Sequence, residues 1–130
     1  MDQDCVFCKI IQGKVPAYKI YEDKDYLAFL DINPWVEGHT LVIPKKHYRW
    51  VWDVKDLGGY FKITGKIANQ LRKIFKTEFV MSYIYGYDVP HAHIQLFPDA
   101  RGKIALFPKE KLGKLTEKKG KELARKISFK

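Results

Sequence analysis

The stretch VPHAHIQLFP, residues 89–98, constrains the fold more than any other part of this chain of 130 residues. Polar side chains occupy every second position from His91 through His93 to Gln95, and apolar side chains occupy the positions between them. Successive side chains of a β-strand point to opposite faces, so the pattern predicts a strand with one buried apolar face. The other face would present two imidazoles and an amide in a row, about 7 Å apart.

The rest of the chain predicts one long helix and several short strands. Leu57–Phe75 carries apolar residues at helical spacing, and Cys5–Ile11 is expected to form a short helix or turn. Strands are expected where β-branched and aromatic residues are bounded by turn formers, at residues 19–21, 26–30, 39–43 and 79–85. Because the links are short, we expect these strands to pair in an antiparallel sheet beside the helices.

The positive charge is concentrated near the C-terminal end. Residues 1–100 carry 13 Lys and Arg against 12 Asp and Glu, whereas residues 101–130 carry 11 against 3. We therefore expect a nearly neutral globular domain at 1–100 and a basic, partly helical segment at 101–130 that packs on the domain or on a dimer partner. The basic segment is a solvated helix face, an arm that attracts phosphate, or an RNA contact.

The two cysteines have the spacing of half a metal site. No apolar run approaches the roughly 18 residues of a membrane span and no signal core is evident, so we expect a soluble cytoplasmic protein with reduced thiols. Cys5 and Cys8 fit a zinc half-site, which needs two further ligands from the four histidines. A redox pair and two unligated thiols are the alternatives, although redox motifs normally follow a strand and open a helix.

Five segments together resemble the histidine-triad (HIT) superfamily across about the first 100 residues. They are CVFC, the YED turn, LAFLDINP, GHTLVIPKKH and VPHAHIQLFP, in the family's order. The resemblance implies an α+β, HIT-like fold with an antiparallel sheet of about five strands, one long helix and one or two short helices. It also implies a homodimer, and hydrolysis or transfer at the α-phosphate of a purine nucleotide or dinucleotide. It also implies that His93, the middle residue of the triad, attacks phosphorus and forms a covalent nucleotidyl-histidine.

Gln95 departs from the commonest family pattern, which has a third histidine at this position. The sequence His-x-His-x-Gln is similar to that of the galactose-1-phosphate uridylyltransferase branch. That branch also binds zinc through a Cys-x-x-Cys pair and two histidines. The resemblance to it implies a structural Zn²⁺ site with the ligands Cys5, Cys8, His47 and His91.

The chemistry of an amide narrows the expected reaction. Gln95 can donate a hydrogen bond to a phosphate oxygen, but it cannot act as a general acid. A protonated third histidine would help most when the leaving group is poor, such as an amine. With His93 and Gln95 as the catalytic residues, we therefore expect a preference for pyrophosphate-type bonds over phosphoramidates.

The resemblance also implies a nucleotide pocket. Asp31 would hold the ribose hydroxyls, unless its carboxylate only caps the turn that follows. His39 would support the active histidine. The residues that would clamp the base, or else belong to the core, are Phe7, Ile11, Phe29 and Ile32.

The loop before the triad also differs from the family. Its sequence, YIYGYDVPH, lacks the asparagine- and glycine-rich pattern that supplies phosphate donors in relatives. Backbone N–H groups or the basic segment would then hold the phosphate. The alternative is a nucleotide- or RNA-binding module with weak or no catalysis.

Overall fold

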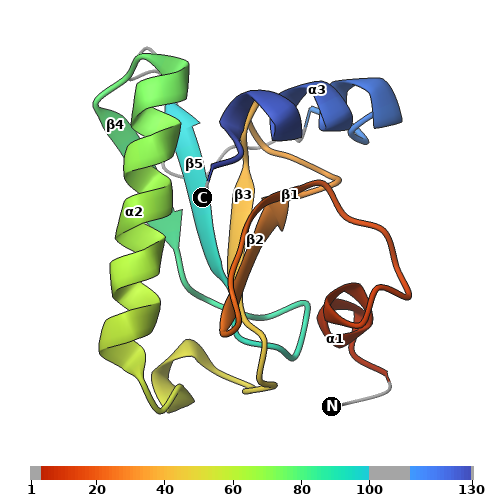
Figure 1. The fold of residues 1–130 in the computed structure, drawn as a ribbon, viewed down its shortest axis with the longest axis vertical. Helices are drawn as coiled ribbons and strands as arrows, with labels where there is room; N and C mark the ends of the chain where they lie inside the picture. Colours follow the sequence, from red (N-terminus) through yellow and green to blue (C-terminus); the bar gives the residue numbers. More distant parts are fainter. Residues whose placement is uncertain (1–3, 100–111, 130) are drawn as a thin grey trace.

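The computed structural model describes residues 4–99 and 112–129. Five strands form one antiparallel sheet in the order β1-β2-β3-β5-β4 (Figure 1). The described residues thus confirm the α+β fold with one long and two shorter α-helices. The elements in chain order are α1 (Val6–Ile11), β1 (Lys19–Glu22), β2 (Tyr26–Leu30), β3 (Thr40–Pro44), the 3-10 turn η1 (Val51–Asp53), α2 (Leu57–Phe75), β4 (Phe79–Tyr83), β5 (Ile94–Asp99) and α3 (Glu117–Ile127).

Helix α2 covers the range that the apolar spacing predicted. It begins after Asp56, whose carboxylate accepts a hydrogen bond from the Gly59 N–H at 3.0 Å. It ends at Lys76, which has a left-handed backbone (φ 52°) and donates its N–H to the Arg72 carbonyl. Its buried stripe, which faces the sheet, consists of Tyr60, Ile63, Thr64, Ile67 and Leu71.

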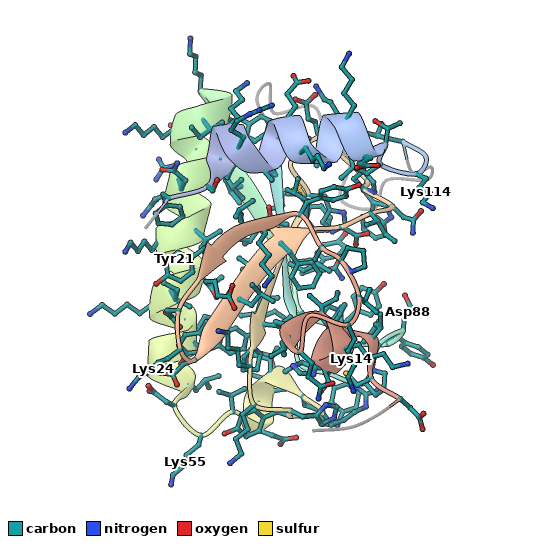
Figure 2. The ribbon with its side chains drawn as sticks, turned by 45° about the vertical axis from the view of Figure 1, so that its right-hand side comes forward. Lys14, Tyr21, Lys24, Lys55, Asp88 and Lys114 are labelled. Atoms are coloured by element: carbon teal, nitrogen blue, oxygen red, sulfur yellow. The ribbon has the colours of Figure 1, made fainter. Side chains whose placement is uncertain are left out.

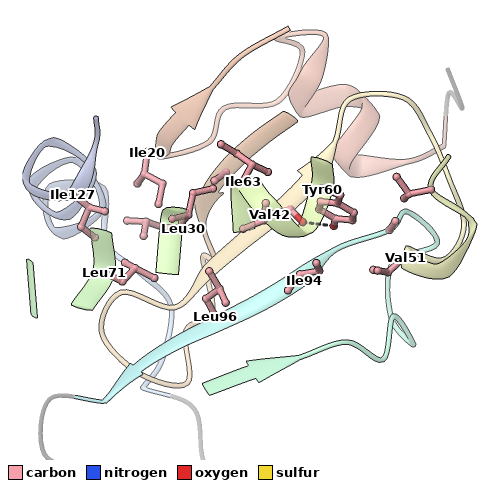
Figure 3. Close-up of a cluster of buried hydrophobic side chains, with 14 of the residues drawn as sticks. Ile20, Leu30, Val42, Val51, Tyr60, Ile63, Leu71, Ile94, Leu96 and Ile127 are labelled. Carbon is pink, nitrogen blue, oxygen red and sulfur yellow. Dashed lines mark hydrogen bonds between the residues drawn. The ribbon is translucent and has the colours of Figure 1, made fainter. Parts of the chain in front are cut away.

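The sheet separates two hydrophobic clusters because alternate side chains of each strand point to opposite faces. The larger cluster joins the sheet to α2 and α3 and includes Val42 and Ile94 (Figure 3). Within it, the buried Tyr60 hydroxyl donates to the Val42 carbonyl at 2.6 Å, drawn as a dashed line in Figure 3. The smaller cluster joins α1 to the sheet and contains Cys5, Phe7, Cys8, Ile10, Leu27, Phe29, Leu41 and Ile43.

The strand expected to carry both histidines begins later than the alternation indicates. β5 begins at Ile94, so His91 and His93 lie in the irregular segment that leads into it. The cause is a change of hydrogen-bond partner, because the Ala92 N–H donates to the Tyr48 carbonyl at 2.7 Å, outside the sheet. The alternation of faces still holds, since the larger cluster contains Ala92, Ile94 and Leu96.

Helix α3 crosses one end of the sheet beside α2 and β1 (Figure 1). Gly120 allows a close approach, because a Cβ at this position would lie 2.5 Å from the Tyr18 ring. Exposed lysines such as Lys114 point away from the ribbon (Figure 2). Residues 100–111 lie outside the described residues, and the division at residue 100 stays a prediction. No helix in the described ranges is long and apolar enough to cross a membrane.

Candidate active site and metal centre

The candidate site residues gather on the sheet face that α1 covers. Asp31 follows β2, His39 precedes β3 and Gln95 lies in β5, all at positions whose alternation places them on the face of the smaller cluster. The other candidates come from α1, from the segment after β3 and from the segment before β5, and they are Cys5, Cys8, His47, His91 and His93.

The two cysteines and two of the histidines form a compact cluster of potential metal ligands. The two sulfurs and two imidazole nitrogens of Cys5, Cys8, His47 and His91 all lie within 4.8 Å of one another. Nδ1 of His91 is 3.3 Å from the Cys5 sulfur, and Nδ1 of His47 is 3.2 Å from the Cys8 sulfur. The Cys5 sulfur also accepts the Cys8 N–H at 3.3 Å, so the start of α1 fixes the spacing of the two thiols. This donor set suits tetrahedral zinc.

The backbone selects the tautomer of His91 that a metal requires. Its Nε2 lies 2.8 Å from the Pro44 carbonyl oxygen, which can only accept, so Nε2 carries the proton and Nδ1 presents a lone pair to the sulfurs. Burial lowers the pKa of His91 to about 4, and a neutral imidazole is the form that binds metals. Burial raises the pKa of the Cys5 thiol, which would release its proton when a cation binds. The residues present therefore fit zinc.

His93 is 7% exposed and has the opposite tautomer. Its Nδ1 lies 2.8 Å from the backbone carbonyl of His91, so Nδ1 carries the proton and Nε2 keeps a free lone pair. Burial lowers the pKa of His93; the carboxylates of Asp31 and Asp88 oppose this shift, and the charge of Arg49 adds to it. The ring is therefore a neutral imidazole with one nucleophilic nitrogen.

His39 and Gln95 form a hydrogen-bonded pair with a defined direction. The Trp35 N–H donates to Nδ1 of His39 at 3.2 Å, so Nε2 of His39 carries the proton and donates to Oε1 of Gln95 at 2.8 Å. The NH₂ group of Gln95 is left as the donor end of the amide. Burial raises the pKa of Tyr85, Asp88 adds to that shift, and a hydrogen bond from Gln95 opposes it.

The carboxylate of Asp31 caps the turn that follows it, which is one of the two roles that the sequence left open. Its Oδ1 accepts the Asn33 N–H at 2.8 Å, which is the turn cap. Its Oδ2 lies 3.6 Å from Nε2 of His39, and the side chain is 22% exposed. One oxygen thus stabilises the turn, while the other is directed toward the histidine and is accessible to a ligand.

The four apolar candidates lie in different environments. Phe7 and Phe29 are buried in the smaller cluster, with their rings edge-on and the centroids 5.4 Å apart. Phe7 also meets the His93 ring edge-on at 5.3 Å. Ile11 packs half-buried against the same cluster. Ile32 is exposed and lines a cavity of about 680 Å³ between the α1–β1 link and α3.

The charges of Arg49 and Asp88 shift the pKa of His93, although no sequence pattern identified these two residues. Nη1 of Arg49 donates to the Gly86 carbonyl at 3.0 Å and thereby contacts the loop before the triad. Arg49, Tyr85, Gly86 and His93 line one pocket. A signal existed in the sequence, because Arg49 lies two residues after His47, and a metal shared by His47 and His91 would bring that segment beside the triad.

The protein has an α+β fold with an antiparallel sheet, and a buried, neutral histidine lies next to a Cys/His cluster. These are the features that the resemblance to the HIT superfamily implied. The family model described as "HIT domain" matches residues 12–102, and the chain belongs to this family. An uncharacterised HIT-like protein of Borreliella burgdorferi is 39% identical over 97% of this chain and 97% of its own length. The adenosine 5'-monophosphoramidase of Saccharomyces cerevisiae is 36% identical over 88% of this chain and 80% of its own length.

Solved structures share the fold. A Hit-like protein from Bartonella henselae matches with a TM-score of 0.82 and 34% identity, over 98% of this chain and 96% of its own. A Zn-bound histidine triad family protein from Mycobacterium smegmatis matches with a TM-score of 0.70 and 26% identity, over 95% of this chain and 93% of its own. The HIT-like fold expected from the sequence is confirmed.

Proposed function

We propose that the protein is a nucleotidyl hydrolase or nucleotidyltransferase with His93 as its nucleophile. The observation that carries the proposal is the tautomer of His93, whose Nδ1 donates to the His91 carbonyl while Nε2 keeps its lone pair. Membership of the HIT domain family and the similarity to a yeast adenosine 5'-monophosphoramidase support a purine nucleotide substrate. Asp31 would accept hydrogen bonds from the ribose hydroxyls, and Phe7 would border the nucleotide beside the nucleophile.

The reaction would proceed in two steps at the α-phosphate. In the first step, Nε2 of His93 forms a bond to phosphorus, and the leaving group departs with the electron pair of the broken bond. In the second step, the oxygen of water forms a bond to phosphorus, the N–P bond breaks, and its electron pair returns to Nε2. The proton of water passes to solvent. An acceptor hydroxyl in place of water would give transfer instead of hydrolysis.

Gln95 would position the phosphate without moving a proton. Its Oε1 accepts the His39 Nε2–H, so its NH₂ group is the end that donates to a phosphate oxygen. Without a general acid at this position, the leaving group must depart as a stable anion. We therefore expect faster cleavage of a dinucleoside polyphosphate than of an adenosine phosphoramidate.

Zinc would have a structural role in this enzyme. The similarity to a Zn-bound relative and the N/S donor cluster support this cofactor. When bound, the ion would neutralise the thiolates and hold the start of α1 against the segment that precedes β5. The proposed ligands are Cys5, Cys8, His47 and His91.

The proposal is tested by trapping the covalent intermediate. Wild type and His93→Ala are incubated briefly with an α-³²P-labelled dinucleoside polyphosphate, denatured at neutral pH and separated by electrophoresis. We expect an acid-labile label on wild type alone, with equal zinc content and melting temperature in the two proteins. Equal labelling of His93→Ala, or no label and no turnover in wild type, would exclude His93 as the nucleophile.

The charge of α3 favours a second candidate function, a nucleotide- or RNA-binding module with weak or no catalysis. Lys118, Lys121 and Lys126 are exposed on α3, whereas Leu123 and Ile127 are buried. Such a surface attracts phosphates and gives strongly salt-dependent binding. RNA retention that is lost when the three lysines are changed to glutamate, but kept in His93→Ala, would support this function.

A further inference from the structure

Arg49 lines the same pocket as the proposed nucleophile, and the described contacts use only part of the N–H donors of its guanidinium. Nη1 donates to the Gly86 carbonyl at 3.0 Å, and the guanidinium carbon lies 3.7 Å from the centroid of the Trp50 ring. No carboxylate in residues 4–99 or 112–129 forms an ion pair with Arg49. An arginine has five N–H donors, so most of them are available to a ligand.

The backbone brings this side chain to His93. The segment after His47 runs alongside the triad, because the Tyr48 carbonyl accepts the Ala92 N–H at 2.7 Å. Arg49 follows directly on Tyr48, and its side chain lines the same pocket as His93. The positive charge of Arg49 thereby lies at the border of a small pocket that His93 also lines.

The guanidinium is also held in a defined orientation. The Trp50 ring supports its flat face, and the Gly86 carbonyl fixes one edge. Gly86 has a left-handed backbone (φ 65°), and a Cβ there would lie 3.5 Å from the Trp50 ring and 3.7 Å from Nη1 of Arg49. The loop before the triad therefore packs closely on the arginine–tryptophan pair, and this arrangement exists before any substrate binds.

The chemistry of phosphoryl transfer requires such a group. Negative charge is spread over the equatorial oxygens in the transition state, and catalysis depends mainly on positioning and on donors to those oxygens. Gln95 supplies only its NH₂ group, and the loop YIYGYDVPH lacks the family's asparagine- and glycine-rich pattern. An arginine offers two parallel N–H donors and a positive charge that match a phosphate.

We infer that Arg49 binds the nonbridging oxygens of the α-phosphate while His93 attacks it, and thus replaces the donors that the loop does not supply. This inference rests on the proposed function. It makes Arg49 a catalytic residue that recognises the phosphate of the nucleotide and not the nucleoside.

Calorimetric titration of the zinc-containing full chain with AMP and with adenosine tests the inference. Arg49→Gln keeps a donor for the Gly86 carbonyl but removes the charge, and Arg49→Met removes both. We expect both variants to bind AMP about tenfold to a hundredfold more weakly, with adenosine affinity unchanged. Turnover should fall about a hundredfold or more. Arg49→Lys, which keeps the charge without the fork, should recover part of the AMP affinity.

Arg72→Met is the matched control, because Arg72 is exposed on α2 and its guanidinium hydrogen-bonds only to Asn69 among the described contacts. AMP affinity equal to wild type in a folded Arg49 variant, or an equal loss of AMP and adenosine affinity, would overturn the inference. Wild type that binds AMP through Arg49 but cleaves nothing would refute the proposed function alone. Wild type that binds no AMP would refute both.

Discussion

The backbone carbonyl of His91 accepts the Nδ1–H of His93 at 2.8 Å, while the His91 ring faces the sulfur atoms of Cys5 and Cys8. A single residue thus connects the candidate zinc centre with the candidate nucleophile. A metal that fixed the His91 ring would also restrict the backbone acceptor that sets the tautomer of His93. Residues one step removed from the chemistry commonly affect activity in this way.

Loss of zinc is therefore expected to reduce turnover more than nucleotide binding. We expect the chelated protein and Cys8→Ser to lose about tenfold to a hundredfold in kcat, because the carbonyl of His91 is no longer fixed. Their affinity for AMP should change little, since Asp31 lies outside the cluster and the Gly86 carbonyl and the Trp50 ring hold Arg49 without the metal. Zinc content by mass spectrometry, kcat and calorimetric AMP affinity are the three measurements.

Adding zinc back separates a positioning role from damage to the fold. The chelated wild type should regain kcat and melting temperature together, whereas Cys8→Ser should not. A zinc-free protein that keeps wild-type kcat would show that the cluster does not position His93. Freshly purified protein with less than about half an equivalent of zinc would count against a structural site with closed coordination.

The buried Tyr60 predicts a specific alkaline destabilisation. Burial raises the pKa of Tyr60, whose hydroxyl donates to the Val42 carbonyl at 2.6 Å. In the unfolded chain the phenol loses its proton above about pH 10, while the folded chain retains it. The folded state then binds more protons, so this contribution to the free energy of unfolding is complete below pH 10 and falls by up to about 1.4 kcal/mol per unit above it.

Tyr60→Phe should therefore be less stable than wild type by about 1 kcal/mol at pH 7, because a buried hydrogen bond is lost. Above pH 10 the difference should shrink and then reverse. Urea unfolding of both proteins between pH 7 and pH 11 measures it. Tyr87→Phe, at an 83% exposed position, is the control for removing a surface tyrosine. Parallel loss of stability in wild type and Tyr60→Phe would refute the prediction.

The elements were predictable where local patterns determine them. Leu57–Phe75 forms one helix because its apolar spacing, the cap at Asp56 and the left-handed Lys76 agree with one another. The alternation around His93 correctly predicted which side chains point to the core. It did not predict where β5 begins, because that depends on a hydrogen bond from Ala92 to the distant Tyr48.

The candidate site was predictable to a similar extent. The ligand requirement of zinc, together with the family resemblance, identified four residues whose donor atoms do converge. Apart from the spacing between His47 and Arg49, the sequence could not show that the charges of Arg49 and Asp88 shift the pKa of His93, since this effect depends on how two irregular segments pack together. Nor could it show that the Asp31 carboxylate caps a turn with one oxygen and approaches His39 with the other.

Among the described residues β4 forms an unpaired edge of the sheet, and this edge predicts where a homodimer would form. β4 ends the strand order, and Phe79 on it is 52% exposed. The opposite edge strand, β1, lies beside α3, and Ile20 accepts a hydrogen bond from Phe129 at 3.3 Å. Unpaired edge strands readily pair with another chain. We therefore expect a dimer through β4, which Phe79→Lys should weaken by about tenfold or more through like-charge repulsion across the two-fold axis.

Light scattering over a range of concentrations measures this change. Trp52→Lys is the matched control, because Trp52 is 64% exposed and lies on η1, away from β4 in the sequence and outside the sheet. A dimer that survives Phe79→Lys but dissociates in Trp52→Lys would place the interface at η1. A monomer in wild type would contradict the expected homodimer.

The last prediction concerns the choice of leaving group, which depends on the partner of His39. In wild type the His39 Nε2–H donates to Oε1 of Gln95. In Gln95→His it would donate to one nitrogen of the new imidazole, and the other nitrogen could carry a proton to the leaving group. General acids contribute about 10²–10⁴ in rate, so a partly aligned one should raise phosphoramidate hydrolysis relative to dinucleoside polyphosphate hydrolysis by about tenfold to a hundredfold.

The ratio of the two kcat/KM values for an adenosine phosphoramidate and a dinucleoside polyphosphate is the measurement. Gln95→Leu is the control, because it removes the donor without supplying an acid and should slow both substrates by a similar factor. Wild type that already prefers the phosphoramidate would show that Gln95 does not restrict the leaving group. The proton would then come from another residue near His93, and Tyr85, whose pKa is shifted by hydrogen bonds with both Gln95 and Asp88, would be the first residue to change.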